Sequence, residues 1–308
     1  MQYHNDLHGA DVMQMMYHMI TRCKLQQILK LNKLDCLSII IAAVCHDIGH
    51  DGYTNSYHVN SISNRAVESN DVSVQETYHT AEVFRILKDP NFNFTEELSN
   101  NEFKLFRKRT MGMILATDMA KHVADLSQLK NIISQNDIKD GENVEKLMEG
   151  DENEVFKNQQ FLLEVILHSA DVSQQTRDFD VVKEWTYLLF EEFFDQGDLE
   201  KQQGLPISML CDRNNTNVAA AQPGFIGFVP IPLFTQLTHI MPDLHACLDT
   251  CKQNLKTWKA YEETEKDKEI YNEKTLPQID VGSIEEKKEE EFTDSEEEEK
   301  KHGEPKSS

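Results

Sequence analysis

Glycine and proline are scarce in this sequence, which contains 12 glycines and 8 prolines among 308 residues. Alternating apolar and polar runs joined by tight-turn dipeptides are also absent, which argues against a fold built from β-strands. Apolar residues instead recur at helical spacing in several windows, which are Asp11–Leu31, Phe103–Leu129, Phe161–His168, Val181–Phe194 and Leu233–Trp258. The sequence therefore predicts an all-α fold.

Cysteine is uncommon as well, and the six cysteines show no Cys-x-x-Cys spacing. This pattern is typical of reduced core cysteines in a cytoplasmic protein, which is the location we expect. No basic segment followed by an apolar stretch opens the chain, so no secretory signal is predicted. The most apolar run, Leu34–Cys45, is about half the roughly 20 residues that a membrane span needs. We expect a buried core helix there and no membrane span.

Basic residues are too few to balance the acidic ones, and the formal net charge is −23. A surface this acidic argues against nucleic acid or anionic lipid as a partner. The segment Tyr261–Ser308 holds 18 Asp or Glu and 8 Lys, a local charge of −10. Such a low-complexity segment buries too little apolar surface to fold alone. We therefore expect one compact domain over residues 1–260 and a charged, mostly disordered tail over residues 261–308.

Three polar stretches lie between the helical windows and are predicted to be loops. They are His50–Asn70, Asn131–Gly150 and Gln203–Pro232, and the second is also compatible with a surface helix. Gln203–Pro232 contains four of the eight prolines. Long loops in compact domains are often functional.

Histidines and aspartates occur in pairs three or four residues apart, which are His4 and His8, His46 and His50, and His168 and Asp171. On a helix such residues share a face, so each pair can aim two side chains at one point. Taken singly, such a pair is more often a surface coincidence or a satisfied core histidine. Asp47 directly follows His46, and these two residues with an upstream histidine and a downstream aspartate would give three or four nitrogen and oxygen ligands, a set that suits a catalytic zinc site. A carboxylate can also bridge to a second, harder ion such as magnesium.

Six segments, in family order, resemble the signature segments of class I 3′,5′-cyclic nucleotide phosphodiesterases, and the resemblance covers roughly residues 3–258. They are Tyr3–His8, His46–Gly52 with Asn55, Thr117–His122, His168–Asp171, Glu191–Asp198, and Gln222 with Phe225. The resemblance implies a compact, multi-helix catalytic domain of the HD type over residues 1–260. Cys211–Arg213 and Gly224–Ile226 most resemble the calmodulin-dependent branch. Family domains have several helices before the Tyr3-His4 motif, so we expect this domain to lack its first helices.

The resemblance implies two divalent metal ions, Zn²⁺ and either Mg²⁺ or Mn²⁺. The implied zinc ligands are His8, His46, Asp47 and Asp171, and Asp47 would also reach the second ion. The water ligands of that ion would be ordered by His50, Glu76 and Thr117. Two such ions would generate a bridging hydroxide that attacks phosphorus, and they would neutralise the phosphate oxygens.

The resemblance also implies how the substrate, cAMP or cGMP or both, is opened to the 5′-nucleotide. His4 matches the general acid that protonates the departing O3′, and Glu192 would keep His4 protonated. The implied substrate-binding residues are Tyr3, Asn5, Asn55, Leu189, Gln222 and Phe225. Among them, the amide of Gln222 suits a purine edge, and the side chains of Leu189 and Phe225 would sandwich the ring. We expect Trp185 and Phe193-Phe194 to belong to the core instead.

Two other functions stay open at this point. One is a different HD-type phosphohydrolase that acts on a nucleoside triphosphate or monophosphate. It would explain His46, Asp47 and Asp171, but not Gln222 and Phe225. The other is a non-catalytic relative that binds a cyclic nucleotide or a protein. The nucleotide preference is also open, because Gln174 stands where many family members carry a different selective residue. Any regulatory protein partner is open as well.

Overall fold

The computed structural model describes residues 1–261, so the predicted tail lies outside the described residues except for Tyr261. The first part of the chain forms α1 (Asp6–Thr21), α2 (Leu25–Ile28), α3 (Lys33–Cys45), α4 (Asn55–Asn60), α5 (Asn64–Ser69), α6 (Val74–Ile86) and α7 (Asn100–Leu115). The second part forms η1 (Met119–Lys121), α8 (His122–Gln135), η2 (Val144–Met148), α9 (Glu152–Asp171), η3 (Ser173–Thr176), α10 (Phe179–Gln203), α11 (Val218–Phe228), α12 (Pro230–Ile240), η4 (Pro242–Leu244) and α13 (His245–Ala260). Residues 1–261 contain no β-strand, only one isolated bridge. The predicted all-α fold is confirmed.

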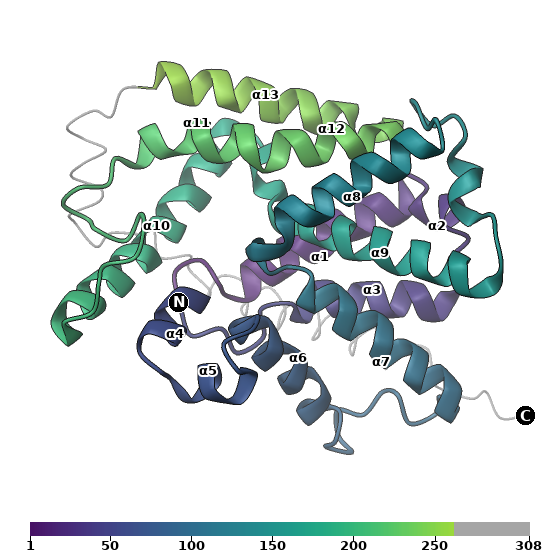
Figure 1. Cartoon of the computed structure of the whole chain (residues 1–308), viewed down its shortest axis with the longest axis horizontal. Helices are drawn as coiled ribbons and strands as arrows, with labels where there is room; N and C mark the ends of the chain where they lie inside the picture. Colours follow the sequence, from purple (N-terminus) through teal and green to yellow (C-terminus); the bar gives the residue numbers. More distant parts are fainter. Residues whose placement is uncertain (262–308) are drawn as a thin grey trace, which may run out of the picture. The chain divides into compact units, whose positions relative to one another are not determined.

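The main core lies where α3 contacts α1 on one side and α7 on another, with α9 packed against both neighbours (Figure 1). The start of α3 is defined by a capping box. The side chain of Asn32 accepts hydrogen bonds from backbone N–H groups of the first turn, and the Asp35 carboxylate accepts one from the backbone N–H of Asn32. The Asp35 carboxylate also pairs with Arg109 of α7 at 3.1 Å, and both side chains are buried. One aspartate therefore caps α3 and fixes α7 against it.

A second layer of helices completes the core. The helix α13 lies along α11 and α12 (Figure 1), and α12 also contacts α8 and α9. A small separate cluster joins α10, α11 and α13 around the buried Trp258, whose ring lies 5.0 Å from that of Phe179. Through α12, this layer contacts α9.

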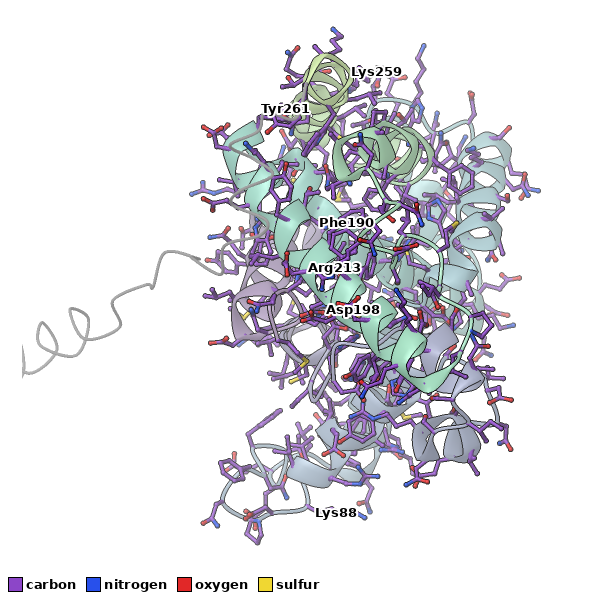
Figure 2. The ribbon with its side chains drawn as sticks, turned by 90° about the vertical axis from the view of Figure 1, so that its left-hand side faces the viewer. Lys88, Phe190, Asp198, Arg213, Lys259 and Tyr261 are labelled. Atoms are coloured by element: carbon purple, nitrogen blue, oxygen red, sulfur yellow. The ribbon has the colours of Figure 1, made fainter. Side chains whose placement is uncertain are left out.

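The segment after α10 folds back along that helix. Arg213 donates a hydrogen bond to Asp198 at 2.8 Å (Figure 2). The buried Glu200 accepts two further hydrogen bonds from Ser208, one from its backbone N–H at 2.7 Å and one from its hydroxyl at 2.6 Å. A buried polar group needs such hydrogen bonds to compensate for the loss of contact with water. These contacts fix residues 205–213 to α10.

Three of the predicted helical windows are each divided in the structure. Asp11–Leu31 becomes α1 and α2, separated at Lys24, whose φ of 59° is left-handed. Phe103–Leu129 is interrupted between α7 and α8. Leu233–Trp258 is interrupted at Met241, because the residue before a proline avoids the helical region and Pro242 follows. The other two windows lie inside α9 and α10, and Leu34–Cys45 corresponds to α3.

The loop predictions for His50–Asn70 and Gln203–Pro232 are partly wrong, because they contain α4, α5 and α11. The polar residues that suggested loops are instead the helix caps. Thr54, Ser63 and Asn217 each accept a backbone hydrogen bond at the start of one of these helices. Pro223 lies inside α11. Short capped helices therefore replace much of both predicted loops.

One stretch of the described residues, Val218–Ile240, has the length and composition of a membrane-spanning helix, with a mean hydropathy of 1.4. In the structure it comprises α11 and α12, and 44% of its apolar window is buried in the fold. Core helices of soluble proteins commonly have the same composition. This single stretch is therefore weak support for a membrane span.

Candidate active site

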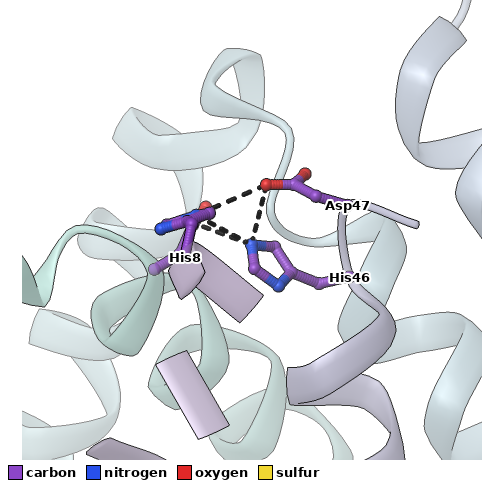
Figure 3. A group of neighbouring side chains, drawn as sticks. His8, His46 and Asp47 are labelled. Atoms are coloured by element: carbon purple, nitrogen blue, oxygen red, sulfur yellow. Dashed lines mark hydrogen bonds and ion pairs between the residues drawn. The ribbon is translucent and has the colours of Figure 1, made fainter. Parts of the chain in front are cut away.

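Helix ends bring four predicted metal ligands together. His8 lies in the first turn of α1, which Asn5 caps by accepting hydrogen bonds from the backbone N–H groups of Leu7 and His8. His46 is the C-cap of α3, and Asp47 follows it. Asp171 is the last residue of α9. The side chains of His8, His46 and Asp47 point toward one another (Figure 3), and all four residues place one ligand atom within 4.8 Å of the others.

The spacing of these four atoms fits a tetrahedral metal shell. His8 Nε2 lies 3.0 Å from Asp171 Oδ1 and 3.3 Å from Asp47 Oδ2. His46 Nε2 lies 3.0 Å from Asp47 Oδ2 and 3.2 Å from Asp171 Oδ1, and the two Nε2 atoms are 3.2 Å apart. Zinc bonds of about 2.0–2.1 Å place tetrahedral ligands about 3.3 Å from one another. The residues present therefore fit a divalent ion in both donor type and spacing.

The electrostatics of the cluster also favour a cation. His46 Nδ1 donates to the carbonyl of Ala43 at 2.8 Å, which directs Nε2 toward the carboxylates. Burial lowers the pKa of His46, but the charges of Asp47 and Asp171 outweigh burial and raise it well above its usual value. Burial raises the pKa of Asp171, and the positive charge of His46 outweighs it in the opposite direction. Two half-buried carboxylates thus share one point where positive charge is stabilised.

A second group, consisting of His4, His50 and Glu192, lies beside the first. His4 Nδ1 is 2.6 Å from Glu192 Oε2, while Glu192 Oε1 accepts the backbone N–H groups of Tyr3 and His4 at 2.7 and 3.0 Å. Burial alone would raise the pKa of Glu192, but the hydrogen bond and charge of His4 lower it to about 2. The His4 ring stacks on His50, with ring centroids 3.9 Å apart. Glu192 is therefore ionised beside an imidazole.

The expectation that each histidine pair aims at one point is wrong. His8 and His46 belong to the first group, whereas His4 and His50 belong to the second. His4 precedes the first residue of α1 and His50 follows the end of α3, so neither shares a helix face with its partner in sequence.

The third pair also separates. Asp171 faces His8 and His46, but His168 Nε2 lies 3.1 Å from Nδ1 of His122 on α8. Both of these histidines are buried. His168 therefore connects two helices and does not join the metal cluster.

Two of the predicted water-ordering residues, Glu76 and Thr117, lie on α6 and just after α7, and Glu76 contacts Asn55 of α4, which was predicted to bind substrate. Asn55 donates to the Glu76 carboxylate at 3.0 Å and accepts from the backbone N–H of Gln75 at 2.8 Å. Burial, with the nearby charge of Asp118, raises the pKa of Glu76 to about 7. Thr117 is buried and donates its hydroxyl to the carbonyl of Ile114 at 2.8 Å. The roles of these residues toward a second ion stay predictions.

The sequence profile of the family described as 3′5′-cyclic nucleotide phosphodiesterase matches residues 3–251. The chain belongs to this family.

The probable 3′,5′-cyclic-AMP phosphodiesterase pde-4 of Caenorhabditis elegans is 36% identical to this chain over 82% of its length and 36% of that protein. The dual specificity calcium/calmodulin-dependent 3′,5′-cyclic nucleotide phosphodiesterase 1B of Bos taurus is 38% identical over 77% of this chain and 41% of that protein. The solved phosphodiesterase domain of the RhoPDE fusion protein from the choanoflagellate Salpingoeca rosetta has a TM-score of 0.73 at 32% identity, covering 84% of this chain and 78% of that chain. The chain thus spans about two fifths of the curated relatives' length. The predicted family is confirmed, and a calmodulin-dependent enzyme is among the relatives.

The residues predicted to bind the base lie on α10 and α11, which contact each other. Gln222 is buried, and its Nε2 donates to the carbonyl of Val218 in the same helix at 3.3 Å. Phe225 packs against both hydrophobic clusters, and Leu189 is half-buried on α10. Their arrangement around a purine stays a prediction.

Two residues that lie near the site were not predicted from the sequence. Trp185 was expected in the core, but its ring lies 5.3 Å from the Tyr3 ring and 6.1 Å from the His8 ring. Its position two helical turns before Glu192 was the available signal, since residues seven apart share a helix face. His79 Nδ1 bonds the carbonyl of Ile48 at 2.8 Å, and its Nε2 lies 3.7 Å from Asp47. His79 lies three residues after Glu76 on α6, and residues three apart share a helix face, so this spacing was the available signal that His79 lies near the site.

Proposed function

We propose that this chain hydrolyses the 3′,5′-cyclic phosphodiester of cAMP, cGMP or both to the 5′-nucleotide. The observation that carries the proposal is the position of an imidazole–carboxylate pair next to a four-residue metal cluster. The rings of His4 and His8, one from each group, have centroids 5.9 Å apart. A group that releases a proton and a group that binds cations can therefore act on one phosphate.

The metal cluster supports two divalent ions, Zn²⁺ and either Mg²⁺ or Mn²⁺, as the cofactors. His8, His46, Asp47 and Asp171 would hold the first ion, and Asp47, whose second oxygen lies toward His79, would also reach the other. His50, Glu76 and Thr117 would order the water around that second ion. When bound, the ions would activate the attacking water and neutralise phosphate charge.

His4 would serve as the general acid. Its Nδ1 is bonded to Glu192, which leaves Nε2 to face a substrate, and about a fifth of the side chain is exposed. The ionised Glu192 accepts a hydrogen bond from Nδ1 and so fixes the orientation of the ring. Water adds its oxygen to phosphorus, the bond from phosphorus to O3′ breaks, and the proton from His4 goes to O3′. The proton released by the water restores His4, so the reaction consumes only water.

Substrate binding would involve Tyr3, Asn5, Asn55, Leu189, Gln222 and Phe225. Tyr3 is buried and its hydroxyl accepts a hydrogen bond from Nε2 of Gln174 at 2.8 Å, so the two residues are fixed together. The names of the relatives include a cyclic-AMP enzyme and a dual-specificity enzyme, which supports testing both nucleotides. We also propose a cytoplasmic location, which the six free cysteines support.

Incubation of the purified chain with cAMP and cGMP, in Mg²⁺ or Mn²⁺ and with or without a chelator, tests the proposal. We expect 5′-nucleotide only in the presence of metal, and we expect Asp171→Asn to abolish it. Nucleotide binding without any product would favour the non-catalytic relative. Turnover of a nucleoside triphosphate but not of either cyclic nucleotide would favour another phosphohydrolase activity.

A further inference from the structure

The turn between α3 and α4 carries Asp47 and His50, and it is held in place by side chains from outside it. Gly49 and Gly52 adopt left-handed φ values of 71° and 85°, which other residues rarely adopt. The turn contains only two internal backbone hydrogen bonds, from Ile48 and His50, before Gly52 donates to the His50 ring. Its conformation therefore depends on contacts with α4, α5 and α6.

Gln75 of α6 provides one of these contacts. Its Nε2 has two hydrogens, and they go to Asp51 Oδ1 at 2.7 Å and to the carbonyl of Tyr53 at 2.6 Å. Asp51 Oδ1 also lies 3.2 Å from Nε2 of His58 on α4. Gln75 and His58 are both buried, so their hydrogen bonds to the turn are shielded from water.

Arg65 of α5 provides a second set of contacts to the turn. One guanidinium nitrogen donates to the carbonyl of Gly49 at 3.0 Å, and another lies 3.3 Å from Asp51 Oδ2 and also donates to Gln75 Oε1. The guanidinium carbon lies 3.6 Å from the centre of the Tyr78 ring. That ring closes on Gly49, because a Cβ there would be 2.9 Å from Tyr78 Cε1.

These contacts fix the residues on both sides of His50, through the carbonyl of Gly49 and the side chain of Asp51. The His50 ring stacks on His4 and accepts the backbone N–H of Gly52 at 2.9 Å. A shift of this turn would therefore move His50 relative to His4, and it would move Asp47 relative to the other metal ligands.

We propose that Arg65 is a positioning residue that fixes this turn, so that His50 faces His4 and Asp47 stays within the metal cluster. The proposal rests on the proposed phosphodiester hydrolysis. Arg65 does not touch the reacting groups, and it acts through Gly49, Asp51 and Gln75. The planar fork of arginine makes these contacts together while it stacks on Tyr78. A lysine, with one compact charge, can replace only one of them.

The test compares Arg65→Ala and Arg65→Lys with a matched control, Arg85→Ala. Arg85 also lies over the Tyr78 ring, at 5.9 Å, but it is more exposed, and within residues 1–261 its ion pair is with Glu82. The measurements are kcat and KM for cyclic nucleotide and, independently of activity, the Kd for Mn²⁺ by calorimetry. We expect Arg65→Ala to lower kcat about 10- to 100-fold, to change KM less than about threefold, and to raise the Mn²⁺ Kd about tenfold. Arg65→Lys should recover only part of both losses, and Arg85→Ala should stay within about twofold of the wild type.

A folded Arg65→Ala protein with kcat and Mn²⁺ Kd within about twofold of the wild type would overturn the proposal, as would full recovery by lysine. If Arg65→Ala fails to fold, the same measurements are made on Arg65→Lys and Asp51→Asn, because each of these variants keeps most of the side-chain volume. The absence of turnover by the wild-type chain would instead overturn the proposed function. The Mn²⁺ Kd would still decide the role of Arg65.

Discussion

The histidines around the site differ in which ring nitrogen the rest of the protein engages. Nδ1 of His4 bonds Glu192 and Nδ1 of His46 bonds a carbonyl, so Nε2 of each faces the site. His50 is reversed, since its Nδ1 accepts the backbone N–H of Gly52. Its Nε2 therefore carries a proton, and the ring is a hydrogen-bond donor that does not suit a metal ligand. For this reason we interpret the second group of His4, His50 and Glu192 as proton-transfer machinery and not as another metal site.

Replacement of His4 tests this interpretation at the level of one residue. His4→Ala removes the proton donor but none of the four metal-cluster residues, so kcat should fall about 10²- to 10⁴-fold while the Kd for Mn²⁺ stays within about twofold. Steady-state kinetics and calorimetry check both values. A cyclic nucleotide with sulfur at the 3′ position supplies the control, because a thiolate leaves without needing a proton. Equal losses on both substrates would contradict the assignment of His4 as the general acid.

At the scale of the elements, close packing of α10 against the following segment depends on Gly197. A Cβ on Gly197 would lie 1.9 Å from the backbone oxygen of Cys211, a contact that forces the segment away. Gly197→Ala should therefore strain the hydrogen bonds between Glu200 and Ser208 and lower the free energy of unfolding by about 1–3 kcal/mol. Urea unfolding measures the loss. Gly227→Ala in α11 is the control, since nothing lies within 4 Å of its added Cβ, and an equal loss there would contradict the packing argument.

The His122–His168 contact joins α8 to α9 and predicts a pH dependence. His122 Nε2 donates to the carbonyl of Phe228, so its Nδ1 accepts from His168 Nε2, and the buried Nδ1 of His168 has no hydrogen-bond partner. Burial lowers the pKa of His168 to about 4. The unfolded chain, with a histidine pKa of about 6.5, then takes up the proton first. The stability that the neutral ring contributes is complete above about pH 6.5 and is lost progressively as the pH falls toward 4.

His168→Gln should remove this dependence. Between pH 7 and 5 the wild type should lose up to about 1.4 kcal/mol per pH unit more than the variant, as measured by urea unfolding. Groups that titrate identically in both proteins, including the metal cluster, cancel in the comparison. Parallel stability curves for the two proteins would contradict the prediction.

The sequence predicted those elements whose apolar residues form one continuous pattern. The run Leu34–Cys45 differs from α3 by one residue, and the windows in α9 and α10 lie inside longer helices. The breaks were not predictable in the same way, because apolar spacing continues across the gap between α7 and α8. Likewise, the caps Thr54 and Ser63 have the composition of a loop, and only their backbone partners show that they start helices.

For the site, the sequence identified residue types and their family pattern but could not show which residues meet. Spacing placed His168 with Asp171, whereas the fold directs one toward α8 and the other toward α1. Trp185 has the composition of a core residue, and only the approach of Tyr3 places it at the site. Arg65 gave no signal, because its partners are backbone and side-chain atoms of a turn that folds next to it only in three dimensions.

At the scale of the whole molecule, the metal cluster connects parts of the chain that are distant in sequence. His8 lies on α1, His46 and Asp47 follow α3, and Asp171 ends α9, so the cluster joins three helices of the main core. In the absence of a cation, two half-buried carboxylates would lie close together. The unfolded chain cannot form this arrangement, so a bound ion should stabilise the folded domain in addition to any role in catalysis.

Removal of metal should therefore lower the melting temperature of the domain. An ion present at about 100 times its Kd contributes about 2.7 kcal/mol of stability through mass action. For a domain of this size, that change corresponds to a shift of about 5–10 °C. Thermal melts with added Zn²⁺ or Mn²⁺, compared with melts in chelator, measure the shift. The matched control is Asp171→Asn, which keeps the shape of the side chain but removes its charge from the cluster. Its melting temperature should hardly respond to the chelator, because the site has lost one of its two anionic ligands. A wild-type chain that melts at the same temperature in metal and in chelator would show that the cluster binds no ion that contributes to folding, and the metal-dependent mechanism would lose its structural basis.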